Sequence, residues 1–382
     1  MALNLVEILQ EHWPSYQRAN RSRLCSAHYR AVRCVLACRT PELGGRLYQC
    51  RSCQKNHFAY HSCNHRSCPN CGAAKQEEWT ARQEARLLPV PYFLITFTVP
   101  SELRNLAQHF PKELYDLILK ESSIALCEVT ASKLKRPHLR IGITSVLHTW
   151  GRQMQHHPHV HCIVPTLGYD PIADELIRPK KDQFFVHFKP LAERFRNRLR
   201  KALKEQHPEI YQRLTSAQLK ALSPSTNWNV HLQHAGSGKT AVRYLARYVN
   251  RTAFHPKRLL GYDQQGRIRL KYTSSQTKQT SIIALSAFEF IRRFLIHVLP
   301  KGFARIRHYG YCSSAAKKTY TRIRLLCGCG GDLIIKLPQR DPFTCSDCGG
   351  KLNFLSELER IPRISAPRGP PQSSRPALTV NK

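Results

Sequence analysis

Acidic side chains are scarce in this sequence. Asp and Glu number 25 against 60 Lys and Arg, which leaves a formal net charge of +35 over 382 residues. The basic residues are spread along the whole chain, so a polyanion with an extended footprint, such as nucleic acid, is the simplest partner. From charge alone, a ribosome-associated protein or a simply soluble basic protein remains an alternative.

Long apolar runs are also absent. No segment supplies the roughly 18 uninterrupted apolar residues that a membrane helix needs. Residues 1–13 (MALNLVEILQEHW) carry acidic residues within an apolar pattern and lack a small-residue cleavage site, so we expect an amphipathic helix and not a signal peptide. We therefore expect a cytoplasmic protein without a membrane partner. Its 15 cysteines should then stay reduced and be available for metal.

The length predicts more than one folded unit, because a typical domain has roughly 150 residues. We expect a zinc-bound DNA-binding domain over residues 1–88, an α+β domain over 89–310, a small zinc-ribbon-like module over 311–360 and a disordered Pro/Ser-rich tail over 361–382. Within the second domain, composition and periodicity predict strands near 92–99, 139–150 and 157–164, and helices near 112–126 and 240–251. A further helix over 286–299 is expected to pack on the same domain.

Two CxxC pairs, Cys50 with Cys53 and Cys68 with Cys71, are separated by a short segment. This arrangement brings four thiolates to a tetrahedral zinc ion, whose binding can fold a segment with little core. Other residues could replace a ligand or form a second site, and the sequence does not decide between them: Cys63, His61, His65, Cys25, His28, Cys34 and Cys38.

A second cysteine cluster follows near the C-terminus. Cys327 and Cys329, together with Cys345 and Cys348, resemble a small zinc ribbon, and neighbouring glycines permit tight turns. We therefore predict a second structural zinc site from these four residues.

The segment 157–164 (HPHVHCIV) alternates in the manner of a strand, which places His159 and His161 on one face. Two imidazoles side by side form half of a divalent-metal site that another side chain and substrate phosphates complete. The third ligand is either His148, on the preceding strand of a hairpin, or His157, and we slightly favour His148.

The segment 240–251 (TAVRYLARYVNR) fits a helix with one apolar stripe. The stripe consists of Val242, Leu245, Ala246 and Val249. Tyr244 and Tyr248 fall about 200° and about 240° from Val242, away from that stripe. Two phenols one turn apart suit nucleophilic attack on a phosphodiester, although surface tyrosines without a catalytic role are the alternative for this helix alone. Four basic side chains are expected to contact DNA phosphates: Lys239, Arg243, Arg247 and Arg251.

Several motifs in order resemble the two-tyrosine HUH transposases of rolling-circle insertion sequences, where HUH denotes His, a hydrophobic residue and His. They are CRTPELGGRLYQCRSC (38–53), SCNHRSCPNCG (62–72), FLITFTVP (93–100), HTWGRQMQHHPHVHCIVP (148–165), YLARYVNR (244–251) and RHYGYC (307–312). The resemblance covers nearly the whole chain. It implies an endonuclease core on a central antiparallel sheet with flanking helices, an N-terminal zinc-binding domain, a metal on His159 and His161, and nucleophiles at Tyr244 and Tyr248.

The implied activity is metal-dependent nicking and rejoining of single-stranded DNA through 5′-phosphotyrosine intermediates. Mg²⁺ or Mn²⁺ would be the catalytic ion and Zn²⁺ the structural one, and the partners would be single-stranded DNA at element ends and target DNA in the nucleoid. A plasmid replication initiator or relaxase with the same chemistry is the nearest alternative. A non-catalytic zinc-finger regulator is an alternative of another class, and it would need neither the histidine strand nor the outward tyrosines.

Overall fold

A computed structural model describes residues 3–179, 183–249, 253, 255–273, 277, 279–330, 333–337 and 343–361, with the backbone alone for 247–249. The chain divides into two compact units. Unit 1 comprises Met1–Gly72, His255–Val298 and Gln339–Lys382, and unit 2 comprises Ala73–Phe254 and Leu299–Pro338. Within the described ranges, no helix has the length and apolar character needed to cross a membrane.

Unit 2 is built on a seven-stranded antiparallel sheet with the order β7-β6-β4-β5-β3-β8, in which β12 also pairs with β4. Its strands are β3 (Tyr92–Thr98), β4 (Arg140–Trp150), β5 (His156–Pro165), β6 (Gly168–Asp170), β7 (Glu175–Ile177), β8 (Asn229–His234) and β12 (Ile306–Gly310). The predicted strands correspond to β3, β4 and β5, and they form the middle of the sheet.

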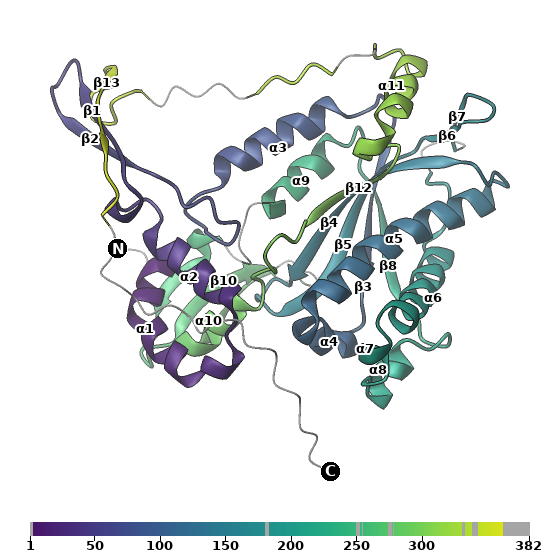
Figure 1. The fold of residues 1–382 in the computed structure, drawn as a ribbon, viewed down its shortest axis with the longest axis horizontal. Coiled ribbons are helices and arrows are strands. Elements are labelled where there is room, and N and C mark those ends of the chain that lie inside the picture. Colours follow the sequence, from purple (N-terminus) through teal and green to yellow (C-terminus); the bar gives the residue numbers. More distant parts are fainter. Residues whose placement is uncertain are drawn as a thin grey trace. The chain divides into compact units, whose positions relative to one another are not determined.

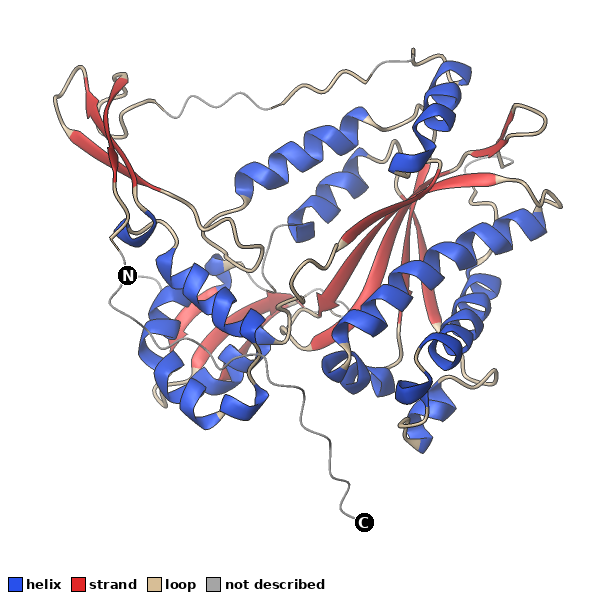
Figure 2. Ribbon diagram, in the orientation of Figure 1, coloured by secondary structure: helices blue, strands red, loops and turns tan. Residues whose placement is uncertain are grey.

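Helices cover both faces of this sheet (Figure 2). They are α3 (Ala73–Ala85), α4 (Arg104–His109), α5 (Pro111–Lys133), α6 (Phe188–Gln206), α7 (Pro208–Tyr211), α8 (Ser216–Ala221), α9 (Lys239–Val249) and α11 (Lys317–Leu326). Figure 1 shows α3 and α9 beside each other on one face and α5 and α6 on the other. Because both faces are covered, the central strands are buried on both sides, and α+β is the observed class.

The two faces have separate cores. Side chains such as Ile143, Leu147 and Val160 pack towards α5 and α6. Side chains on the opposite face, such as Val146 and Ile163, pack with Leu245 of α9. The alternation of side chains along β4 and β5 therefore decides which residues face α9.

Unit 1 contains the helices α1 (Leu5–Ala19), α2 (Ser26–Ala37) and α10 (Ala287–Leu295) and two three-stranded sheets. One sheet has the order β13-β1-β2, from β1 (Gly45–Cys50), β2 (Asn56–Tyr60) and β13 (Leu352–Leu358). The other has the order β11-β10-β9, from β9 (Leu259–Tyr262), β10 (Ile268–Thr273) and β11 (Thr280–Leu285). The expected N-terminal amphipathic helix is α1, which begins with a capping box between Asn4 and Glu7.

The units follow a different division from the predicted domains. Helix α3 belongs to unit 2, whereas residues 343–361 belong to unit 1 and do not form a module of their own with 311–338. The helix predicted over 286–299 is α10, and it packs on α1, where Phe288 contacts Tyr16 at a ring-centroid distance of 5.3 Å. The expectation that it packs on the sheet domain is wrong, because periodicity identifies an apolar face but not its partner. Residues 362–382 of the predicted tail lie outside the described residues.

Candidate active site and metal centres

Three histidines meet on the face of the unit 2 sheet that carries α9. His148 of β4 lies directly opposite His159 of β5, and His161 lies two residues further along the same strand. The nitrogen atoms that the three imidazoles can offer to one ion lie within 4.8 Å of one another, and all three side chains are buried. We call these three residues the histidine group.

Hydrogen bonds orient two of these rings. The Nδ1 of His159 donates to the main-chain carbonyl of His157 at 2.7 Å, which leaves Nε2 of His159 as the atom with a lone pair. The Nδ1 of His161 lies 2.9 Å from Oγ1 of Thr96 on β3. Such contacts to the second nitrogen of a histidine fix the ring and its tautomer for metal binding.

The electrostatics also suit a cation. Burial lowers the pKa of His161 to about 4. Burial, followed by the neighbouring charge of His161, lowers the pKa of His159 well below its usual value. Both rings are therefore neutral near pH 7, with lone pairs to offer.

The spacing also suits a cation. Nδ1 of His148 and Nε2 of His159 are 2.8 Å apart. Two ligands about 2.1 Å from an octahedral ion are about 3 Å apart, so the donor set fits a divalent cation.

His157 does not belong to this group. Its Nδ1 accepts a hydrogen bond from Nη2 of Arg104 at 3.1 Å. Its ring nevertheless lies close to the group, with its centroid 5.0 Å from that of His159. Of the two candidates for a third ligand, the geometry favours His148.

Helix α9 presents Tyr244 to the histidine group. Val242, Leu245 and Ala246 of the predicted stripe are buried. Tyr244 is 37% exposed, and its ring stands edge-on to that of His161 at a centroid distance of 5.9 Å. The phenol that was expected to face outward is thus close to a candidate metal ligand.

The other predicted residues of this helix differ in their surroundings. Arg243 forms an ion pair with Glu84 of α3 at 2.7 Å, and Lys239 is exposed at the start of α9. The side chains of Arg247, Tyr248 and Val249 and the whole of Arg251 lie outside the described residues.

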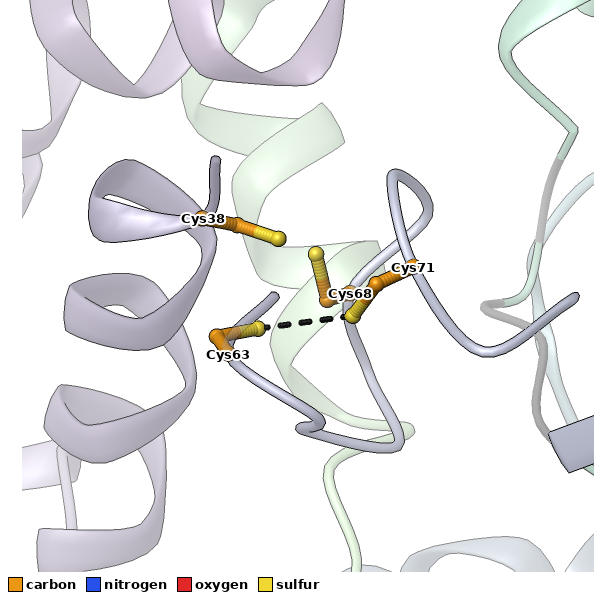
Figure 3. Close-up of side chains that lie close together, drawn as sticks. All are labelled: Cys38, Cys63, Cys68 and Cys71. Atoms are coloured by element: carbon orange, nitrogen blue, oxygen red, sulfur yellow. Dashed lines mark hydrogen bonds between the residues drawn. The ribbon is translucent and has the colours of Figure 1, made fainter. Parts of the chain in front are cut away.

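Two groups of four cysteines lie in unit 1, and they differ from the predicted sets. Cys38, at the end of α2, joins Cys63, Cys68 and Cys71, and Figure 3 shows the four side chains pointing towards one another. The sulfur atoms of Cys63 and Cys71 are 3.6 Å apart. We call this set the first cysteine group.

The second cysteine group consists of Cys50, Cys53, Cys345 and Cys348. The sulfurs of Cys50 and Cys348 are 3.4 Å apart, and those of Cys53 and Cys345 are 3.8 Å apart. The antiparallel pairing of β1 with β13, which sets Cys50 opposite Leu352, brings the two CxxC pairs together.

These groupings correct two predictions. Cys50 and Cys53 do not share a site with Cys68 and Cys71, and the C-terminal set of Cys327, Cys329, Cys345 and Cys348 does not form. Cys345 and Cys348 complete the group around Cys50, while Cys327 and Cys329 belong to unit 2. The reason is that spacing along the chain identifies a CxxC pair but not the pair that faces it. His65 belongs to neither group, and Cys63 is a member of the first.

Backbone hydrogen bonds favour the thiolate form of Cys50. The N–H groups of Ser52 and Cys53 donate to Sγ of Cys50 at 3.3 and 3.5 Å. The hydrogen bond from Cys53 has the largest effect and lowers the pKa of Cys50. Burial opposes it and the hydrogen bond from Ser52 adds to it, so the pKa of Cys50 is lowered to about 6. The thiolate is the form that binds zinc, and four cysteine sulfurs gathered at one point fit a tetrahedral zinc ion.

Sequence reasoning did not identify Thr96 and Arg104. Thr96 stands opposite His161 in the pairing of β3 with β5, so the alternation of the predicted strand over 92–99 held a signal for it. Arg104 follows in the short helix α4, and nothing in the local sequence relates it to a histidine 53 residues away.

Comparison with known proteins gives consistent matches. Residues 142–319, which include the histidine group and Tyr244, match a family described as "Putative transposase", and residues 8–99 match the "Transposase zinc-binding domain". The protein named "Putative transposase y4qJ" of Sinorhizobium fredii is 31% identical over 320 residues, which cover 80% of this chain and 79% of that protein. "Transposase for insertion sequence element IS801" of Pseudomonas savastanoi pv. phaseolicola is 27% identical over 355 residues, which cover 86% and 83%.

No solved structure matches the chain. The sequence relatives, however, span most of its length, and the two family matches fall on the catalytic candidates and on the N-terminal cysteines. The chain therefore belongs to the two-tyrosine HUH transposase family of bacterial insertion sequences, whose N-terminal part is a transposase zinc-binding domain.

Proposed function

We propose that this transposase nicks and rejoins single-stranded DNA through 5′-phosphotyrosine intermediates during rolling-circle transposition. The observation that carries the proposal is the position of Tyr244, whose ring stands 5.9 Å from that of His161 although the residues are far apart in the sequence. A tyrosine that only fills space on an amphipathic helix has no reason to face a buried histidine group.

In the proposed reaction the hydroxyl oxygen of Tyr244 attacks the phosphorus of the scissile phosphate. The bond between phosphorus and the 3′ oxygen breaks, the phosphate stays on the tyrosine, and the 3′ oxygen takes up a proton in place of the one that the tyrosine loses. Because the new bond is again a phosphodiester, its free energy is conserved, and attack by a 3′-hydroxyl can reverse the step without ATP.

The histidine group would hold the divalent ion, which when bound polarises the scissile phosphate. The protein's own part is to keep the rings in place, through the carbonyl of His157 and the hydroxyl of Thr96. Three imidazoles without a carboxylate favour Mn²⁺ over Mg²⁺, because nitrogen ligands bind transition metals more tightly than hard magnesium.

We propose Tyr248 as the second nucleophile. A second tyrosine would let the enzyme hold one cut end while it cuts another strand, which transfer to a target requires. The basic residues Lys239, Arg243, Arg247 and Arg251 would contact DNA phosphates near these tyrosines. For Arg243 this requires an exchange of its present partner, Glu84, for a phosphate.

The zinc-binding unit is proposed to hold the DNA around this site. The two cysteine groups would bind structural zinc, and the net charge of +35 supplies the attraction for the polyanion.

The test is incubation of the full-length protein with single-stranded oligonucleotides from the element's ends and Mn²⁺. We expect an SDS-resistant protein–DNA adduct that is lost when Tyr244→Phe is combined with Tyr248→Phe. Tyr211→Phe, on α7 of the same unit, is the matched control and should leave the adduct unchanged. An adduct that survives the double substitution, or none with the wild-type protein, would refute the proposal.

A further inference from the structure

Arg104 is a cation without an acidic partner beside the histidine group. Its Nη2 donates to Nδ1 of His157, and its Nε is buried without a hydrogen-bond partner among the described residues. No carboxylate of the described ranges forms an ion pair with it. A guanidinium has five N–H donors, so most of its capacity is left for a ligand.

Other partly buried arginines of unit 2 have acceptors for their donors, and for Arg196 the acceptor is the main-chain carbonyl of Thr226 at 2.6 Å. Arg198 pairs with Glu121 at 2.7 Å, and Arg136 pairs with Asp170 at 2.9 Å. Removing a cation from water without a counter-charge is unfavourable, which is why such arginines normally face carboxylates. Arg104 therefore has the environment of a residue whose counter-ion is a bound anion.

The position of Arg104 links it to the proposed reaction centre. It begins α4, shortly after β3, the strand that carries Thr96. His157, which accepts its hydrogen bond, also supplies the carbonyl that orients His159. His157 thus connects Arg104 to a candidate metal ligand, and an anion bound to Arg104 would lie near the histidine group. The planar fork of a guanidinium matches the paired oxygens of a phosphate.

We propose that Arg104 binds a backbone phosphate of the single strand next to the phosphate that is cut, with His157 holding the guanidinium in place. This inference rests on the proposed function, because it takes the strand at the histidine group as the substrate. Arg104 would fix the register of the strand, so that the scissile phosphate meets Tyr244.

The experiment measures binding without strand cutting. The anisotropy of a fluorescent oligothymidine is followed with the full-length, zinc-loaded protein over a series of salt concentrations and without added Mg²⁺ or Mn²⁺. For Arg104→Gln we expect roughly threefold to tenfold weaker binding and a slope of log affinity against log salt that is smaller by about 0.7, the loss of one contact to a single strand.

The matched control is Arg136→Gln, which removes an arginine that carboxylates already neutralise, and its slope should equal that of the wild type. An unchanged slope for Arg104→Gln, or an equal fall for Arg136→Gln, would overturn the proposal. Arg104→Lys keeps the charge but loses the fork, so it should keep the slope and still bind more weakly. If Arg104→Gln does not fold, this variant decides, and unchanged affinity for it counts against the proposal.

A further arm tests whether the anion is free phosphate. Inorganic phosphate at constant ionic strength should leave binding by the wild type unchanged. A weakening as large as that caused by Arg104→Gln would assign the site to free phosphate and overturn the inference. An adduct that persists in the tyrosine variants would overturn the proposed function. An unchanged salt slope for Arg104→Gln would overturn the role of Arg104 alone, so the two failures can be told apart.

Discussion

The histidine group and the second cysteine group are both sets of metal ligands, but they are assembled over very different distances along the chain. His148 and His159 are 11 residues apart on paired strands, whereas Cys50 and Cys348 are 298 residues apart. The register of neighbouring strands is enough to form the first set. The second requires the chain to return to its N-terminal region after passing through both segments of unit 2.

The entropy of closing the longer loop is modest. Loop closure costs about 0.6 kcal/mol for each doubling of length, so the longer separation adds about 3 kcal/mol. Structural zinc sites provide roughly 10 to 16 kcal/mol, which is more than enough to offset this. We therefore expect the histidine group to depend on the sheet, and the return of residues 343–361 to unit 1 to depend on zinc as well as on the pairing of β13 with β1.

The largest effect is expected from breaking the histidine group. His161→Ala should lower adduct formation with Mn²⁺ by roughly a thousandfold, because a ligand beside Tyr244 is lost. The zinc content should stay at two ions per chain, since neither cysteine group is touched. Gel quantification of the adduct and atomic absorption measure the two quantities. Activity within tenfold of the wild type would contradict the assignment of this group.

The second effect concerns the distant cysteines. Cys345→Ser combined with Cys348→Ser should reduce the zinc content from two ions to one and free β13 from β1, so that trypsin cuts at Lys351. Cys327→Ser combined with Cys329→Ser is the matched control and should keep both ions, because these residues lie in neither group. If the control variant loses zinc and the first does not, the C-terminal set predicted from the sequence would be right after all.

The sequence predicted what depends on local periodicity. A period of two placed His159 and His161 on one face, a hairpin brought in His148, and a period of 3.6 separated Tyr244 from the buried stripe. These features need only one strand pair or one helix, and the structure contains them.

What the sequence could not supply are pairings between distant segments. Whether the Cys68 pair faces Cys50 or Cys38 depends on how β1 and α2 pack, and no spacing encodes that. The same holds for Arg104, whose contact with His157 depends on where α4 lies against β5. The family resemblance identified the motifs but not these contacts.

A smaller effect is expected from loosening the histidine group without removing a ligand. Thr96→Val keeps the shape of the side chain but removes the hydroxyl that contacts Nδ1 of His161. Loss of such an orienting contact typically weakens metal affinity about 10-fold to 100-fold. Titration of adduct formation against Mn²⁺ should therefore need more metal, with most of the rate recovered at saturation. Thr98→Val, on the same strand, is the control, and an equal shift there would argue against an orienting role for Thr96.

The smallest effect is expected from the ion pair beside the second cysteine group. Lys55 contacts Asp347 at 2.9 Å, but the side chains are 63% and 44% exposed, so water and salt screen the attraction. Lys55→Gln should keep both zinc ions and shift Tm by less than about 2 °C.

Lys351→Gln is the matched control, because it removes the same charge beside the same sheet, directly before β13, at a residue that forms no ion pair among the described residues. The two variants should be indistinguishable in zinc content and in Tm. If Lys55→Gln alone released one zinc ion, the ion pair would be needed to hold residues 343–361 against β1. The second cysteine group would then depend, like the histidine group, on contacts of the protein itself.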